Sequence, residues 1–214
     1  MLRAVNPGHR MVAGISVAGG VALGSLDFLW IKYLPYPFAE LGNSTATWAV
    51  AAFFLGRWVR SGPLRAALAA SVLLVVAVPS YYLAATLVQG DDLAVLWAPS
   101  SVLWMAFGVV AGVVFGVGGT WSRRDGWRQV IGAALPAAVF VEEAARFAGR
   151  ANDPGYPGAG WNVAIDLALA LLLLVLVGRS NRQRALAAAV ALPLAGVILV
   201  AFAVVGGSAA SAIG

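Results

Sequence analysis

Residues 130–147 read VIGAALPAAVFVEEAARF. The first eleven of these residues carry no charge, and the run then closes with Glu142, Glu143 and Arg146 on neighbouring helical turns. Charged side chains within a membrane helix are costly, so they usually face a bundle interior or a cavity and mark function. An internally paired salt bridge that only orients helices is the alternative, because polar groups also hold membrane helices together. The rest of the chain is interpreted as a scaffold around this cluster.

The composition is typical of an integral membrane protein. Of the 214 residues, 61% are hydrophobic and only 11% are charged, against roughly 25% charged residues in a soluble domain. The chain is basic, with a formal net charge of +5, but its arginines lie in short loops between apolar runs. Such residues set the orientation of membrane helices, so we expect no nucleic-acid partner. The sequence has no cysteine, which excludes disulfides and thiolate chemistry.

Seven apolar runs approach the ~20 residues that span a membrane. We therefore predict an all-α bundle of seven transmembrane helices that forms a single domain over residues 1–214. The predicted helices are 11–31, 45–60, 64–88, 95–118, 128–148, 161–178 and 185–206.

The loop charges orient this bundle. Eleven of the fourteen basic residues fall on one side, which the positive-inside rule makes cytoplasmic. They are Arg3, Arg10, Arg57, Arg60, Arg65, Arg123, Arg124, Arg128, Arg179, Arg182 and Arg184. Lys32, Arg146 and Arg150 fall on the other side. We therefore expect a multi-pass protein of the inner (plasma) membrane with a cytoplasmic N-terminus and an external C-terminus.

Three carboxylates on three predicted helices share one depth. A rise of ~1.5 Å per residue puts Asp27, Glu142 and Asp166 roughly 21–24 Å from the inner face. A shared polar pocket explains this layer, and chance alignment is the alternative, because acids near helix ends cost less than acids at the centre. Glu142 and Asp166 are the leading candidates for a catalytic acid, followed by Asp27.

The connection between the first two predicted helices, residues 32–44, holds two prolines and several aromatic residues. We expect an interfacial or re-entrant segment that caps the outer end of the bundle. Glu40 in this segment completes the candidate catalytic set, and Asn43 or Ser44 can cap the next helix. The residues predicted to support the site are Glu143, Arg146, Asn43 and Asn162.

Aromatic residues gather in the outer layer, where a membrane-interface belt explains several of them. As walls of a substrate pocket we predict Trp48, Tyr81, Tyr82, Trp104, Phe140 and Trp161. Small residues recur at four-residue spacing in two helices, which predicts close helix packing. These are Gly20 and Gly24, and Gly108, Gly112 and Gly116.

Several kinds of site are missing from the sequence. There is no phosphate-binding loop, no dinucleotide signature and no histidine cluster with metal-ligand spacing, and His9 is the single histidine. We expect an enzyme here to use neither a metal nor a cofactor.

Short motifs carry a resemblance. The run Glu40 to Trp48, then Tyr81-Tyr82, Trp104 with its glycines, and Phe140-Val-Glu142-Glu143 resemble a family of small actinobacterial membrane proteins of unassigned function. The similarity covers most of the chain. More loosely, the size, the seven spans and the intramembrane acids resemble the membrane-bound terpene cyclases of meroterpenoid and indole-sesquiterpenoid pathways. That resemblance implies metal-free protonation of a prenyl alkene or epoxide.

The leading functional hypothesis is a terpene cyclase that acts on a lipophilic, farnesyl-type substrate. Burial in a low-dielectric site favours the neutral, proton-donating form of a carboxyl group. Aromatic faces stabilise a carbocation by up to ~2 kcal/mol per ring when dry. A prenyltransferase of the same pathway is a possible partner. The alternatives are a small proton-coupled transporter, which needs a similar carboxylate network, and a non-catalytic membrane scaffold.

Overall fold

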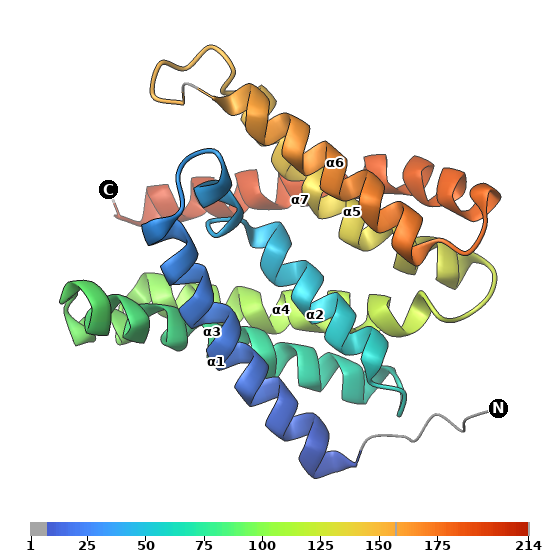
Figure 1. The fold of residues 1–214 in the computed structure, drawn as a ribbon, viewed down its shortest axis with the longest axis horizontal. Helices are drawn as coiled ribbons and strands as arrows, with labels where there is room; N and C mark the ends of the chain where they lie inside the picture. Colours follow the sequence, from blue (N-terminus) through green and yellow to red (C-terminus); the bar gives the residue numbers. More distant parts are fainter. Residues whose placement is uncertain (1–7, 157, 214) are drawn as a thin grey trace. The chain divides into compact units, whose positions relative to one another are not determined.

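The computed structural model describes residues 8–156 and 158–213, with side-chain surroundings as far as Val204. Arg3 and Gly214, which the orientation prediction uses, lie outside the described residues. The described chain is all-helical, which confirms the all-α part of the predicted fold class, and it contains seven α-helices (Figure 1). Their bounds are α1 His9–Tyr33, α2 Thr45–Trp58, α3 Pro63–Gln89, α4 Pro99–Trp121, α5 Trp127–Ala148, α6 Ala159–Val177 and α7 Asn181–Ile213.

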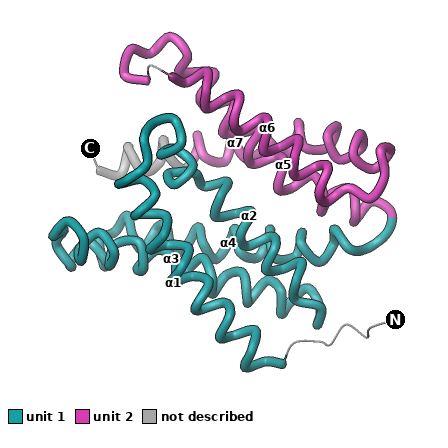
Figure 2. The backbone as a smooth tube through the Cα atoms, viewed as in Figure 1, with its two compact units in different colours: residues 1–125 teal, residues 126–214 magenta. Residues whose placement is uncertain are grey.

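The helices fall into two compact units, residues 1–125 with α1–α4 and residues 126–214 with α5–α7 (Figure 2). Each unit is described by itself. The prediction that the whole chain forms one domain stays a prediction.

In unit 1, glycines bring α1 against α3. A Cβ on Gly20 would lie 2.5 Å from the carbonyl oxygen of Leu73, and one on Gly24 would meet the backbone of Ala77. The residue numbers at these contacts increase together on both helices, from Gly20 and Leu73 to Gly24 and Ala77, so α1 and α3 run parallel. The structure therefore confirms close packing at this pair of glycines.

The glycines of α4 pack the same way against α3. Gly108 lies against Leu74, and Gly112 lies against the backbone of Ser71. Gly116 follows, where a Cβ would lie 2.6 Å from the carbonyl oxygen of Ala66. The residue numbers at these contacts increase along α4 while they decrease along α3, so these two helices are antiparallel. Because a glycine has no side chain, the backbones approach closely without a hydrophobic force between helices, as membrane helices require.

The connection between α1 and α2 folds back onto the end of α1. It contains a short 3-10 helix, Phe38–Leu41, and the indole Nε1 of Trp30 donates to the carbonyl of Phe38 at 2.7 Å. Ser44 caps α2, because its Oγ accepts from the backbone N–H of Thr47 at 3.1 Å. Of the two residues predicted as caps, the structure uses Ser44 and leaves Asn43 exposed.

The predicted helix bounds differ most at α4. That helix begins at Pro99 and not at residue 95, because a separate 3-10 turn, Leu93–Trp97, precedes it. Proline suits the first turn of a helix, where its missing N–H has no partner to lose. Asp92 stabilises the 3-10 turn by accepting from the N–H of Ala94 at 2.9 Å.

In unit 2, α5 is the central helix and packs against both α6 and α7. Most of its residues are buried, and they include small alanines that allow close contact and the acids Glu142 and Glu143. The outer helices α6 and α7 instead expose leucines and valines, as lipid-facing helices do.

Five helices are long and apolar enough to cross a membrane, namely α1, α3, α4, α6 and the part of α7 up to Val204. The other two fall short for different reasons. Helix α2 has only 14 residues, which span ~21 Å. Helix α5 has 22 residues but holds charged side chains within its apolar sequence. The described chain is therefore consistent with a membrane-embedded protein that has at least five spanning helices.

Candidate functional site

Two buried glutamates share one arginine at the end of α5. Glu142 and Glu143 are 1% and 2% exposed. The Nε atom of Arg146 lies 2.7 Å from Oε1 of Glu142, and its Nη2 atom donates to Oε1 of Glu143 at 3.2 Å. Both pairs follow from helical spacing, because residues three and four apart lie on the same face. Arg146 is 36% exposed and lies over the ring of Phe202 on α7, 5.6 Å from its centroid.

Helix α6 brings two more polar side chains to the core of unit 2. Asn162 and Asp166 are separated by four residues, so they lie one above the other on one face of the helix, and each is 3% exposed. Asp166 is close enough to Glu143, Arg146 and Glu142 to interact with all three electrostatically. We name Glu142, Glu143, Arg146, Asn162 and Asp166 the α5–α6 cluster.

Several polar atoms of this cluster make no hydrogen bond with any described residue. They are the Oδ2 atom of Asp166, both amide atoms of Asn162, and the Oε1 atom of Glu142 and Nε atom of Arg146, which form an ion pair without hydrogen-bond geometry. Buried polar groups are almost always hydrogen-bonded, and an unsatisfied group costs about 1–3 kcal/mol. The cluster therefore holds unused hydrogen-bonding capacity beside its carboxylates, on the face that α6 turns toward α5.

The charges of the α5–α6 cluster do not balance. Glu142 and Glu143 contact the guanidinium of Arg146, and Asp166 is near enough to interact with it electrostatically, so three carboxyl groups share one cation. Buried charges must be paired or neutralised, and coupled carboxyl groups titrate as one system. The chemistry that such an arrangement supports is the holding and transfer of a proton.

Asp27 occupies a separate aromatic environment in unit 1. It is 8% exposed, and its Oδ2 atom accepts from the indole Nε1 of Trp48 at 3.0 Å. Tyr81 interacts electrostatically with Asp27 and makes edge-to-face contacts with Phe28 and Tyr82, at centroid distances of 5.6 and 5.3 Å. The structure thus brings together an acid from α1 and predicted wall residues from α2 and α3.

The other predicted site residues are more scattered. Phe140 is buried on α5, two residues before Glu142, but Trp104 and Trp161 are 42% and 69% exposed. Asn43 is exposed, and Glu40 is half-buried in the 3-10 helix of the α1–α2 connection. The cavity that Asp27, Glu142 and Asp166 are expected to share stays a prediction, because these residues belong to the two separately described units.

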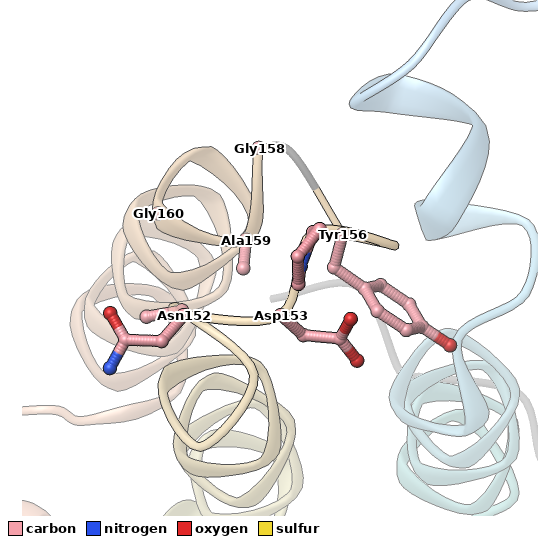
Figure 3. Close-up of a pocket in the computed structure, with 8 residues that line it drawn as sticks. Asn152, Asp153, Tyr156, Gly158, Ala159 and Gly160 are labelled. Carbon is pink, nitrogen blue, oxygen red and sulfur yellow. The ribbon is translucent and has the colours of Figure 1, made fainter.

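A shallow hollow of about 390 Å³ lies in the α5–α6 connection (Figure 3). It is lined by residues such as Asn152, Asp153 and Tyr156, and the guanidinium of Arg150 lies 4.6 Å from the centroid of the Tyr156 ring. None of the predicted site residues lines it. Sequence reasoning did not single out this loop, although its glycines, prolines and Asn152 mark it as irregular.

Gln129 was also missed. It is fully buried in the first turn of α5, and neither of its amide atoms has a hydrogen-bond partner among the described residues. The signal in the sequence is weak, since a single glutamine beside Arg128 is typical of a helix start. In the part of the chain that the structure describes, no group of three or more His, Asp or Glu residues is arranged to hold a metal ion.

A family model matches residues 4–208, nearly the whole chain. The chain belongs to the family of unknown function DUF6518. This confirms the predicted membership in a family of unassigned function, while the looser resemblance to terpene cyclases stays a prediction. No curated protein and no solved structure matches the chain.

Proposed function

We propose that this protein is a membrane-embedded acid catalyst, and specifically a terpene cyclase that protonates a prenylated, farnesyl-type substrate. The observation that carries the proposal is the α5–α6 cluster, in which two buried glutamates contact one arginine and the buried carboxyl group of Asp166 lies near them. A carboxyl group held neutral in a dry site is the proton donor that an alkene requires. Arg146 can divide the roles, because one guanidinium balances one carboxylate of the cluster and leaves another carboxyl group able to keep its proton.

Glu142 and Asp166 are the proposed donors. Transfer of a carboxyl proton to a terminal prenyl alkene, or to its epoxide, gives a tertiary carbocation. A second alkene of the chain then attacks this cation and closes a ring, and loss of a proton to the resulting carboxylate restores the acid. The reaction is an isomerisation in which no cofactor is consumed, so the site needs none. Buried Phe140 and the ring of Phe202 beside Arg146 are suited to stabilise the cation.

We propose that all seven helices cross the plasma membrane, with the N-terminus in the cytoplasm and the C-terminus outside. The parallel packing of α1 and α3 supports this for the short helix α2, because two parallel spans require the chain to return between them. Helix α5 is long enough at ~33 Å and packs alongside the apolar α6. The lipophilic substrate would then reach the site from the bilayer, after a prenyltransferase has formed it.

Amide variants of the two proposed acids test the function. Glu142→Gln and Asp166→Asn keep the size of the side chain but remove the transferable proton, so each is expected to abolish turnover. The assay presents detergent-solubilised protein with a panel of prenylated aromatic compounds and detects isomeric products by mass spectrometry. Asp91→Asn is the matched control, because Asp91 is an exposed loop carboxylate. Full activity in both amide variants would rule out these residues as the acid.

The proton-coupled transporter is the second candidate, favoured by the buried carboxyl group of Asp166, whose unpartnered Oδ2 atom can take up and release a proton. Reconstituted liposomes with a pH-sensitive dye separate the two functions. Proton flux driven by a solute gradient, lost in Asp166→Asn and unchanged in Asp91→Asn, would favour the transporter. Product formation without flux would favour the cyclase. A protein inactive in both assays would leave only the scaffold hypothesis.

A further inference from the structure

The end of unit 1 that holds the α2–α3 connection gathers arginines from two distant parts of the sequence. The Nη2 atom of Arg123, just beyond α4, donates to the carbonyl of Val59, just beyond α2, at 3.0 Å. The guanidinium of Arg57 donates to the hydroxyl of Ser122. These two contacts join the C-terminal ends of α2 and α4 (Figure 1).

This junction also places two further arginines beside each other. Arg60 directly follows Val59, and Arg124 directly follows Arg123, so the contact between Val59 and Arg123 brings the four arginines to the same end of unit 1. We name Arg57, Arg60, Arg123 and Arg124 the arginine patch. Burial lowers the pKa of the Arg123 guanidinium, and the positive charges of Arg60, Arg57 and Arg124 lower it further. Arg123 is thus close enough to each of the other three arginines for their charges to repel.

The four members do different things. Arg57 and Arg123 are half-buried and hold the helix ends together, where the negative ends of the helix dipoles favour a cation. Arg60 and Arg124 are exposed, and their side chains make no hydrogen bond or ion pair with any residue that the structure describes. Helix capping accounts for the first pair and leaves the second pair available.

The net charge and position of the patch indicate its ligand. Four arginines and the following Asp125 sum to +3. The patch lies just after the last residue of α4 and just before the first residue of α3. Both helices are apolar enough to span a membrane. Leu64 and Leu68, in the first turns of α3, are 74% and 60% exposed, as residues facing lipid chains are. A cationic group at this depth is at the level of the lipid headgroups.

We propose that the arginine patch is a binding site for the phosphate headgroup of an anionic phospholipid, with Arg60 and Arg124 as its direct contacts and Arg57 and Arg123 as the residues that position them. Arginine binds phosphate through two parallel N–H groups, and clusters of basic residues next to membrane helices attract anionic lipids. This site belongs to unit 1 alone and does not depend on the proposed catalytic function.

The test uses the full chain in a neutral detergent and measures its thermal unfolding while phosphatidylglycerol is added to the micelles. Phosphatidylglycerol is expected to raise the unfolding midpoint, and zwitterionic phosphatidylcholine at the same fraction is not. In the double variant R60Q/R124Q, half-saturation is expected at roughly a ten- to thirtyfold higher fraction of phosphatidylglycerol. Both substitutions leave the contacts of Arg57 and Arg123 in place, so the fold is retained.

Two further variants make the result specific. R179Q/R182Q removes the same charge from two exposed arginines of unit 2 and is expected to keep the wild-type response. R60K/R124K keeps the charge but loses the bidentate geometry, so it is expected to respond between wild type and R60Q/R124Q. An unchanged response in R60Q/R124Q would overturn the proposal, as would an equal loss in R179Q/R182Q. Equal stabilisation by soluble glycerol phosphate or inorganic phosphate would overturn the assignment to a lipid.

Discussion

Removing the guanidinium of Arg146 is expected to destabilise unit 2 more than removing any other arginine of that unit. Arg146 forms ion pairs with both Glu142 and Glu143, which are 1% and 2% exposed. Breaking a buried ion pair from one side typically costs about 3–5 kcal/mol, because the remaining charge stays buried. Since Arg146 is itself 36% exposed, we expect Arg146→Ala to lie at the lower end, about 3 kcal/mol.

This loss can be measured by thermal unfolding in detergent. For a chain of this length, about 3 kcal/mol corresponds to a fall of about 6–12 °C in the unfolding midpoint. Arg150→Ala is the matched control, because Arg150 is exposed and its guanidinium lies over the ring of Tyr156, and its loss should cost less than about 1 kcal/mol. A stranded carboxylate is relieved by taking up a proton, so the difference between Arg146→Ala and wild type should narrow as the pH falls.

A second substitution tests the cause. Adding Glu142→Gln to Arg146→Ala removes one of the stranded carboxylates and should restore part of the lost stability, which is the coupling expected of neighbours. If Arg146→Ala unfolds no more readily than Arg150→Ala, the ion pairs do not stabilise the helix core. Stabilisation of the fold would then no longer explain why the α5–α6 cluster contains an arginine.

Three further outcomes follow from the structure. Gly24→Ala places a Cβ against the backbone of α3 and should cost roughly 1–3 kcal/mol in detergent unfolding, whereas Gly14→Ala, which meets nothing within 4 Å, should be neutral or stabilising. Trp48→Phe removes the N–H donor to buried Asp27 and should cost about 1–3 kcal/mol, with a smaller loss when Asp27 is already asparagine. A reporter enzyme fused to the C-terminus should be active only in the form that works outside the cytoplasm, and activity of the cytoplasmic form would contradict the seven-span topology.

Part of the α5–α6 cluster could be predicted from residue types and their spacing in the sequence. Helical spacing alone placed Arg146 beside both Glu142 and Glu143, because residues three and four apart must meet on a helix. The approach of Asp166 also followed from its estimated depth, although depth says nothing about the face of the helix. The unpartnered amide of Asn162 was not predictable, since it depends on what α5 presents opposite it.

The aromatic residues predicted to line the pocket also divide into those near a buried acid and those that are exposed. Trp48 donates a hydrogen bond to Asp27 and Tyr81 lies near it, but Trp104 and Trp161 are exposed. An aromatic residue in the outer layer can face a site or a lipid interface at equal depth. Only the rotation of each helix about its axis decides between the two, and the low amphipathicity of a membrane helix hides that rotation from the sequence.

The sequence by itself determined the helical class, the number of helices and most of their bounds, because long apolar runs between charged loops must satisfy their backbone hydrogen bonds internally. The glycine spacing also identified the close helix contacts correctly. Only the tertiary structure decided which helices pair, that α1 and α3 run parallel, and that Arg123 meets the carbonyl of Val59. The physical reason is that helix formation depends on local hydrogen bonds and hydrophobicity, whereas these pairings depend on the fit of side chains far apart in the sequence.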